Sequence, residues 1–388
     1  MSASEAAPEA VPPPATARVG AIDGLRAVSA LAVFVFHLTW RSPILRDAVV
    51  EVSGHLDTGV EVFFLMSGFL VFGPFAKAVL TGRPRPALGS YALKRAVRVW
   101  PGYLVVLAAI IVFGPSGIHG AKGLLKHVTL TYLYFHDRGG KGLALAWTLV
   151  VQLTFYVLVP MFAFLMAKAG RRVVAGSVVL VAVGAYMQWY VALDLETYLW
   201  VRILPPALYS LGLGMLFASV RQEGAGTGRL GRSLQRAAAR PSIPLAAAVA
   251  FVALVWAVPA GLDVGTRGGE RALNELLQGL IAGAVCLPVL LSPGAGTWWT
   301  RLLSHRTLAY IGTISYGFYL WHIPVLAWIR PLIVSRYPPT AVGGWFLGLG
   351  LALALAAASW HLIEKPVIDA VGRRLSARRT PGSTTGGK

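Results

Sequence analysis

An arginine and a histidine with ten residues between them are the first candidates for chemistry. Arg26 and His37 lie in the apolar run IDGLRAVSALAVFVFHLTW, and a helix would separate them by roughly 16 Å along its axis. A histidine suits proton abstraction from a hydroxyl group, because its pKa lies near neutrality. The alternative is a histidine that bonds a nearby backbone carbonyl. The run by itself leaves both interpretations open.

A carboxylate is predicted at the same depth as this histidine. Glu61 lies near the start of the next apolar run, TGVEVFFLMSGFLVFGPF. If both runs cross a membrane, this start is the outer end of its run, and His37 lies near the outer end of the first run. If the two runs form a hairpin, Glu61 and His37 share a depth, and a carboxylate beside an imidazole can fix its tautomer. The alternative is that Glu61 simply faces water outside the membrane.

A basic cluster opens the third apolar run, which reads YALKRAVRVWPGYLVVL. Lys94 and Arg98 share one helix face, with Arg95 beside them. Such a cluster suits phosphate binding. It is also the ordinary signal that anchors a membrane helix at the cytosolic side, and by itself the cluster favours the anchor.

Two further runs carry polar and aromatic side chains that could line a chamber. WTLVVQLTFYVLVP contributes Trp147, Gln152 and Tyr156, and ISYGFYLWHIPV contributes Ser315, Tyr316, Tyr319 and His322. Ionisable and polar groups within membrane helices usually face a bundle interior. For the tryptophan, an aromatic belt at the membrane surface is the alternative.

Metal and nucleotide motifs are absent from the sequence. It contains no HExxH, CxxC or phosphate-binding loop signature, so we expect neither a metal site nor a bound cofactor. The one cysteine, Cys286, lies in the apolar run QGLIAGAVCLPVLL. We interpret it as a small buried side chain rather than a nucleophile.

Composition places these residues in a membrane protein. The chain has 388 residues, of which 56% are hydrophobic and 13% charged, whereas soluble domains carry about a quarter charged residues. Apolar runs of about 20 residues are long enough to cross the hydrocarbon core. The sequence therefore predicts an all-α, polytopic transmembrane helical bundle of about ten spans, near 21–40, 59–80, 95–114, 146–168, 172–193, 199–220, 242–262, 274–292, 307–331 and 341–363.

The basic residues predict the orientation of this bundle. With both termini in the cytosol, 24 of the 35 Lys and Arg residues fall on the cytosolic side. The net charge of +19 lies in short loops between apolar runs, which indicates contact with anionic lipid rather than nucleic acid. We expect a disordered cytosolic segment at 1–17, a transmembrane domain at 18–370 and a basic, flexible cytosolic tail at 371–388.

Six segments in order resemble the acyltransferase-3 family of integral membrane O-acyltransferases. They are IDGLRAVSALAVFVFH, GVEVFFLMSGFLV, KRAVRVWPGYLV, WTLVVQLTFYVLVP, ISYGFYLWHIPV and HLIEKP, and they extend over about residues 20–370. The resemblance implies an enzyme that transfers an acyl group, expected to be acetyl or short-chain, from acyl-CoA as co-substrate to a hydroxyl of a carbohydrate-type acceptor. It also implies a location in the bacterial cytoplasmic membrane.

The resemblance assigns roles to particular residues. His37 matches the expected catalytic base, with Glu61 as its catalytic partner, and Arg26, Arg95 and Arg98 match positions that handle the acyl donor. Two positions depart from the family pattern: Glu61 stands where the family usually has Asp, and Gln152 where it usually has Glu. We assign no catalytic role to Gln152, because it lacks the charge.

Two other functions remain open from the sequence. The acceptor could be a small-molecule natural product, such as a macrolide sugar, instead of an envelope glycan. The chain could also be a secondary transporter whose path is lined by His37, Glu61 and the stripe of polar residues at 315–322.

Overall fold

The computed structural model describes residues 15–53, 55–114, 117–135, 141–169, 172–193, 204–224, 228–261, 267–292 and 296–377. Within these ranges the chain is helical, and no strand is formed. The all-α class predicted from the sequence is therefore confirmed for the described part of the chain.

A long helix overlaps each of the ten predicted spans. These helices are α1 (Ala15–Arg41), α3 (Thr58–Thr81), α4 (Leu88–Phe113), α6 (Trp147–Lys168), α7 (Val173–Leu193), α9 (Leu204–Glu223), α11 (Ser242–Gly261), α12 (Arg267–Leu291), α14 (Arg306–Trp328) and α16 (Pro338–Ser359). Shorter helices connect them: α2 (Pro43–Ser53), α5 (Gly120–Val128), η1 (Tyr132–Phe135), η2 (Lys141–Ala146), α10 (Gly228–Ala239), α13 (Trp298–Leu303) and α15 (Arg330–Ile333).

Length and hydropathy identify fewer spans than the ten predicted. Among the described residues, seven helices are long and apolar enough to cross a membrane: α1, α3, α4, α6, α7, α12 and α16 with its extension. Counting α10 and α11 as one span makes eight, although their axes differ by 94°. Helix α14 is not among them, because it carries the polar stripe at 315–322, and α9 is also not among them. The ten-span count and the cytosolic position of both termini stay predictions.

The last long helix extends beyond its predicted end. After α16 comes a π-helical turn, η4 (Trp360–Glu364), and then α17 (Lys365–Ala377). The wider turn precedes Pro366, whose ring cannot fit the regular α-helical hydrogen-bond pattern. Helix α17 continues over 371–377, the first residues of the tail that was expected to be flexible, and Lys365 pairs with Asp369 at 2.7 Å. The rest of the expected tail, and residues 1–14 of the expected leading segment, lie outside the described residues.

Glycines bring α3 and α9 into close contact at the centre of the bundle. A Cβ atom on Gly68 would lie 2.0 Å from the Leu211 carbonyl oxygen, and one on Gly214 would lie 1.9 Å from the Leu65 carbonyl oxygen. Small residues of this kind allow membrane helices to pack backbone against backbone. Helix α1, which carries Arg26 and His37, packs against α14 and α3.

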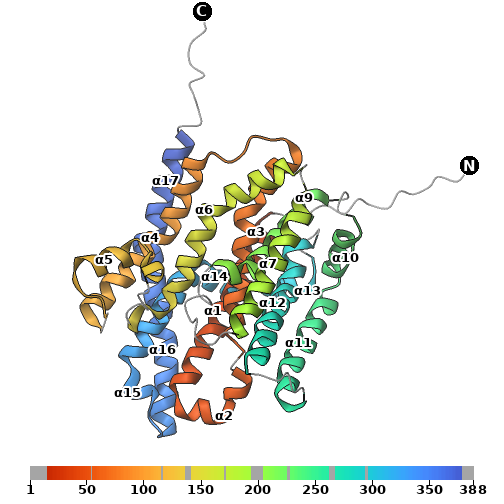
Figure 1. Ribbon diagram of the computed structural model, residues 1–388. Helices are drawn as coiled ribbons and strands as arrows, with labels where there is room; N and C mark the ends of the chain where they lie inside the picture. The colour runs from red at the N-terminus through yellow and green to blue at the C-terminus, as the bar shows by residue number, and fades with distance from the viewer. Residues whose placement is uncertain are drawn as a thin grey trace, which may run out of the picture.

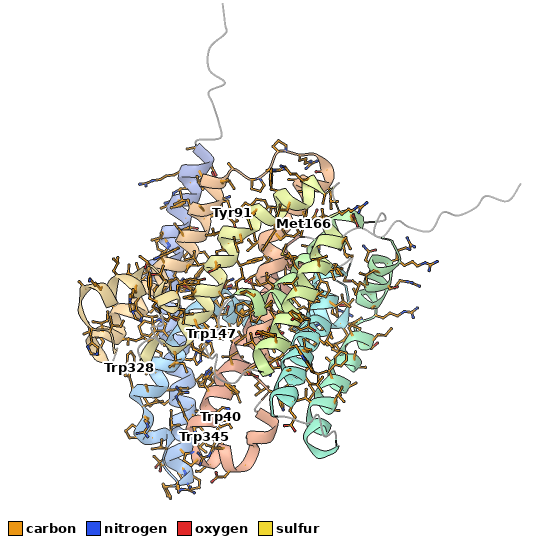
Figure 2. All side chains as sticks on the ribbon, viewed as in Figure 1. Trp40, Tyr91, Trp147, Met166, Trp328 and Trp345 are labelled. Carbon is orange, nitrogen blue, oxygen red and sulfur yellow. The ribbon has the colours of Figure 1, made fainter. Side chains whose placement is uncertain are left out.

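The outer surface has the character expected beside lipid. Large apolar side chains on α6, α11 and α16 are strongly exposed, with Val157, Val249 and Phe346 each about 70% accessible. Figure 1 shows α2 and α15 at one end of the bundle and α17 at the other. Trp40 and Trp345 lie near the end that holds α2 (Figure 2), where tryptophan suits a membrane interface.

Candidate active site

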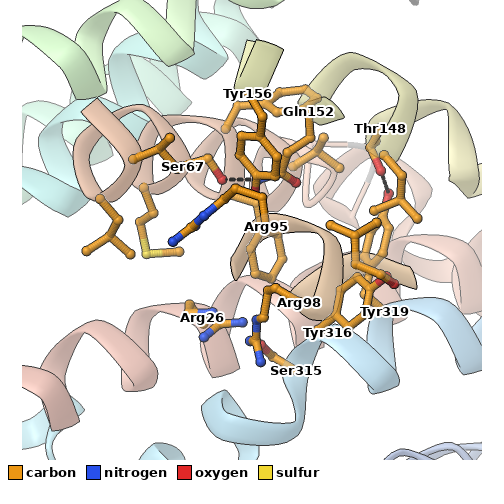
Figure 3. Close-up of a pocket in the computed structure, with 18 residues that line it drawn as sticks. Arg26, Ser67, Arg95, Arg98, Thr148, Gln152, Tyr156, Ser315, Tyr316 and Tyr319 are labelled. Carbon is orange, nitrogen blue, oxygen red and sulfur yellow. Dashed lines mark hydrogen bonds between the residues drawn. The ribbon is translucent and has the colours of Figure 1, made fainter. Parts of the chain in front are cut away.

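Three arginines from two helices converge on one cavity in the bundle. Arg26 comes from α1, and Arg95 and Arg98 come from the first turns of α4. The cavity measures about 160 Å³, and no Asp or Glu is among the described residues that line it. We call it the cationic cavity. Figure 3 shows the three guanidinium groups gathered on the same side.

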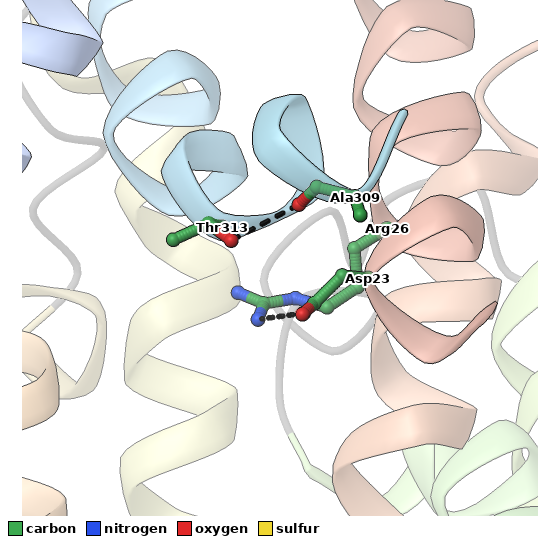
Figure 4. Close-up of polar contacts among 4 residues, drawn as sticks. All are labelled: Asp23, Arg26, Ala309 and Thr313. Carbon is green, nitrogen blue, oxygen red and sulfur yellow. Dashed lines mark hydrogen bonds and ion pairs between the residues drawn. The ribbon is translucent and has the colours of Figure 1, made fainter. Parts of the chain in front are cut away.

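Different contacts hold each guanidinium group. Arg26 pairs with Asp23 one turn earlier on α1, at 3.5 Å, beside the start of α14 (Figure 4). Arg95 lies over the ring of Tyr156 at 5.6 Å, and Arg98 over the ring of Tyr316 at 5.8 Å. Stacking on aromatic rings orients a guanidinium without neutralising its charge. The cavity therefore keeps a positive charge suited to an anion.

Two buried polar atoms in this cavity lack a hydrogen-bond partner. They are Nε of Arg95 and Oγ of Ser315, whose side chain is fully buried. Buried polar groups almost always have a partner, so unpaired ones inside a cavity indicate a ligand or ordered water. Both residues therefore favour a polar ligand beside the arginines.

A second cavity, of about 330 Å³, adjoins the first. Val60, Phe64 and Tyr319 line both cavities. The second cavity is also lined by His37 and by three acidic residues: Asp57, Glu61 and Glu275. We call it the acidic cavity. A molecule in one cavity is thus separated from a molecule in the other by a few shared side chains.

The hydrogen bonds of His37 determine which ring nitrogen can act as a base. Its Nδ1 lies 2.8 Å from the carbonyl oxygen of Val33. A carbonyl only accepts, so Nδ1 carries the proton and Nε2 keeps its lone pair. Nε2 forms no hydrogen bond within the described part of the chain. The two interpretations left open by the sequence are therefore compatible, because the carbonyl contact produces the tautomer that a base needs.

His322 lies against this histidine. Its Nε2 is 3.4 Å from Nδ1 of His37, and its own Nδ1 faces the carbonyl of Phe318 at 3.3 Å. The same reasoning gives His322 a protonated Nδ1, so its Nε2 can accept a weak hydrogen bond from His37. His322 is fully buried and lines neither cavity.

Glu61 has a different partner from the one expected. Its carboxylate accepts a hydrogen bond from the hydroxyl of Ser210 on α9, whereas His37 bonds Val33 and His322. The hairpin does bring Glu61 and His37 to the same cavity, as their shared depth predicted. The close packing of α3 on α9 directs the carboxylate toward Ser210 instead of toward the imidazole.

The remaining candidates divide between the two cavities. Tyr156, Ser315 and Tyr316 line the cationic cavity, Trp147 lines the acidic cavity, and Tyr319 lines both. The Tyr319 hydroxyl lies 3.2 Å from Oγ1 of Thr148, at the boundary between them. Figure 3 shows this pair.

Several lining residues were not singled out from the sequence. Gln152, to which we assigned no role, donates a hydrogen bond to Ser67 in the cationic cavity. Gln188 and Glu275 line the acidic cavity. Both fall within predicted spans, so the rule that polar residues inside a membrane are functional candidates could have found them.

Comparison with known proteins assigns the family. Residues 19–361 match the family described as Acyltransferase domain, the acyltransferase-3 family. The chain belongs to this family. Acyltransferase-3 proteins are integral membrane O-acyltransferases, and this family match does not favour the transporter alternative. No solved structure matches the chain.

Curated relatives of the chain are distant in sequence. It is 27% identical to nodulation protein 10 of Rhizobium leguminosarum, over 82% of this chain and 85% of that protein. It is 24% identical to the peptidoglycan O-acetyltransferase OatA of Listeria monocytogenes, over 90% of this chain, and 24% identical to the acyltransferase MdmB of Streptomyces mycarofaciens, over 96% of this chain and 97% of that protein. The chain spans about half, 56%, of the length of its peptidoglycan O-acetyltransferase relatives.

Proposed function

We propose that the protein transfers an acyl group from acyl-CoA to a hydroxyl group of a carbohydrate-type acceptor, with His37 as the general base. The observation that carries this proposal is the pair of adjoining cavities, one with three arginines and one with His37. Cationic side chains suit the phosphates of CoA. Histidine with a free Nε2 suits removal of a hydroxyl proton.

The reaction then takes place near the side chains that both cavities share. Nε2 of His37 accepts the hydroxyl proton while the acceptor oxygen attacks the thioester carbonyl. The new C–O ester bond forms, the C–S bond breaks, and the proton passes from His37 to the departing thiolate. The hydroxyl of Tyr319 lies at the boundary between the cavities, where a donor would stabilise negative charge on the carbonyl oxygen.

The proposed topology agrees with donor binding in the cationic cavity and removal of the acceptor proton by His37 in the acidic cavity. Ten spans with both termini in the cytosol put Arg26, Arg95 and Arg98 near the cytosolic side, where acyl-CoA is made. The same arrangement puts His37 in the outer half of the membrane, closer to acceptors of the cell envelope. The 24-to-11 division of basic residues supports this orientation.

The class of acceptor has two candidates. Relatives named as peptidoglycan O-acetyltransferases favour an envelope glycan. A small-molecule natural product such as a macrolide sugar is the second candidate. MdmB, similar over almost its whole length, is named only as an acyltransferase and does not distinguish the two.

Acyl-CoA turnover by the purified protein tests the proposal. The full chain in lipid nanodiscs would be incubated with acetyl-CoA and soluble hydroxylated acceptors, and free thiol would be measured with a thiol-reactive dye. We expect release that depends on both the acceptor and His37, with ester formation seen by mass spectrometry. Release that is unchanged in His37→Ala would contradict the assignment of the base.

A further inference from the structure

The acidic cavity presents mainly hydrogen-bond acceptors among its polar groups. Asp57 accepts a hydrogen bond from the side-chain amide of Gln278 at 3.1 Å, and Glu61 accepts one from Ser210. In the part of the chain that the structure describes, neither carboxylate forms an ion pair with Lys or Arg. Two carboxylates without a counter-charge therefore line a cavity inside a membrane protein, with Glu275 as the third acidic residue.

Burial of these carboxylates costs free energy unless a bound ligand supplies an opposite charge. Buried carboxylates lose hydration, and a neutral hydrogen bond does not replace a counter-ion. At the outer end of α3, burial raises the pKa of the Asp57 carboxyl to about 7, and the negative charge of Glu275 adds to this effect. A positive charge in the cavity would favour the ionised form of both groups.

An unpaired amide oxygen points to the same kind of ligand. Gln188 is 8% exposed and lines the acidic cavity. Its amide nitrogen lies 3.5 Å from a carboxylate oxygen of Glu275, while its Oε1 has no hydrogen-bond partner. Since no donor among the described residues reaches this oxygen, a donor group on a bound ligand would satisfy it.

The chemistry of the lining favours an organic cation. No group of three His, Cys, Asp or Glu side chains in the described ranges is close enough to hold a metal ion. Aromatic rings line the cavity beside the carboxylates, among them Phe36, Phe64 and Trp147. Carboxylates together with aromatic faces recognise ammonium groups, through charge and through cation–π attraction.

We propose that the acidic cavity binds an acceptor that carries a protonated amine beside its hydroxyl group, such as an amino sugar. This inference rests on the proposed function and adds the charge of the acceptor to it. An ammonium group supplies three N–H donors and accepts none, which complements the carboxylates and the oxygen of Gln188. An anionic acceptor would instead be repelled.

The contact between the ammonium group and the carboxylates also explains why the acyl group would go to the hydroxyl oxygen and not to the amine. A protonated amine has no lone pair, so it stays a binding group and keeps its protons. The hydroxyl oxygen forms the ester C–O bond as the thioester C–S bond breaks. Its proton goes to Nε2 of His37 and then to the thiolate.

Matched sugar probes test the inference through binding. The full chain in nanodiscs would be titrated near pH 7, without acyl donor, with p-nitrophenyl β-D-glucosaminide and with its N-acetyl and 2-hydroxy counterparts. The amine probe is largely charged there and the other two are neutral. We expect the amine probe to bind at least about tenfold more tightly than either neutral probe, as for a desolvated charge contact.

Charge-removing variants assign this preference to the cavity. Asp57→Asn combined with Glu61→Gln keeps shape and hydrogen bonding but removes both charges, so the preference should fall to about twofold or less. Asp57→Glu, which keeps the charge, should retain the preference and shows that the position tolerates change. Asp47→Asn, an exposed carboxylate on α2 outside both cavities, is the matched control and should leave the preference unchanged.

The outcomes separate this inference from the proposed function. Equal binding of all probes, or no binding of any, overturns the inference, as does a preference that survives the double variant. Thiol release from acetyl-CoA is measured on the same samples, with neutral acceptors. Turnover without an amine preference would leave the acyltransferase proposal intact and refute only the cationic acceptor.

Discussion

At the scale of single residues, the backbone carbonyl of Val33 determines which ring nitrogen of His37 carries the proton. Because Val33 accepts from Nδ1, the opposite nitrogen is left able to accept a proton, as the proposed base must, without any carboxylate in contact with the ring. This differs from the expected pairing with Glu61, which bonds Ser210. Glu61 is then better explained by contact with the acceptor than by orientation of the imidazole.

Removal of His37 tests the assignment of the base. Loss of a positioned acid–base group costs about a hundred- to ten-thousand-fold in rate, so His37→Ala should be folded and almost inactive. His37→Gln should be nearly as poor, since an amide cannot accept the proton. Glu61→Gln should lose less activity than either His37 variant. The measurement is acceptor-dependent thiol release at matched protein concentration, with folding checked by size-exclusion chromatography.

His322 should behave as a positioning residue. Its Nε2 accepts weakly from His37, so His322→Ala should lower kcat by about tenfold and leave the KM for donor unchanged. His322→Gln supplies another acceptor oxygen and should recover part of the loss. The opposite pattern, an inactive His322→Ala with a nearly normal His37→Ala, would move the base to α14.

Arg98 should affect the donor more than the acceptor. It lies in the cationic cavity, stacked on Tyr316 and Trp360, where a phosphate contact is proposed. Arg98→Ala should raise the apparent KM for acyl-CoA by about tenfold or more, and Arg98→Lys should also be impaired, since lysine lacks the planar fork of guanidinium. Arg229→Ala on α10, an exposed arginine, is the control. An unchanged donor KM in folded Arg98→Ala would show that this arginine is only a membrane anchor.

At the scale of helices, the contact between α3 and α9 holds Glu61 against Ser210. The contact is close because glycines on both helices remove the side chains that would separate them. Helices α1 and α4 both pack against α14, which brings Arg95 and Arg98 to the cavity that Arg26 lines. The cationic cavity therefore depends on helix packing more than on any one loop.

Substitution at this contact should destabilise the bundle. A Cβ atom on Gly214 would lie 1.9 Å from a backbone oxygen, which cannot move without shifting α3. Gly214→Ala should lower the free energy of unfolding by about 1–3 kcal/mol, as overpacking does, and lower the Tm in a thermal unfolding assay. Gly73→Ala on α3 is the matched control, because nothing lies within 4 Å of its added Cβ. Equal Tm values for the two variants would show that the helices can separate at little cost.

At the scale of the whole molecule, the proposed topology puts the two ends of the chain on the cytosolic side. Reporter fusions after residue 388 and in the loop between α11 and α12 should report opposite sides of the membrane, because the positive-inside bias is strong. Activity-based reporters that work on only one side make the measurement. Signals from the same side at both positions would refute the ten-span arrangement.

The sequence by itself determined the class of protein and the place of most helices. Runs of apolar residues specify membrane helices almost independently of their neighbours, because lipid requires each span to satisfy its own backbone. The sequence also singled out Arg26, Arg95, Arg98 and His37, since ionisable groups in apolar runs are rare. The end of the last helix was misplaced, because basic composition concealed the continued helix through Ala377.

Only the tertiary structure decided which of these residues meet. Spacing along one helix fixes depth, but it cannot fix rotation or the choice of neighbouring helix, which depend on packing between segments far apart in the chain. For that reason His322 was expected as chamber lining and lies instead 3.4 Å from His37, and Glu61 bonds a serine 149 residues away. The acidic cavity combines the predicted pair of α1 and α3 with residues of α7, α9 and α12, and the sequence gives no reason to bring these last three helices to that pair.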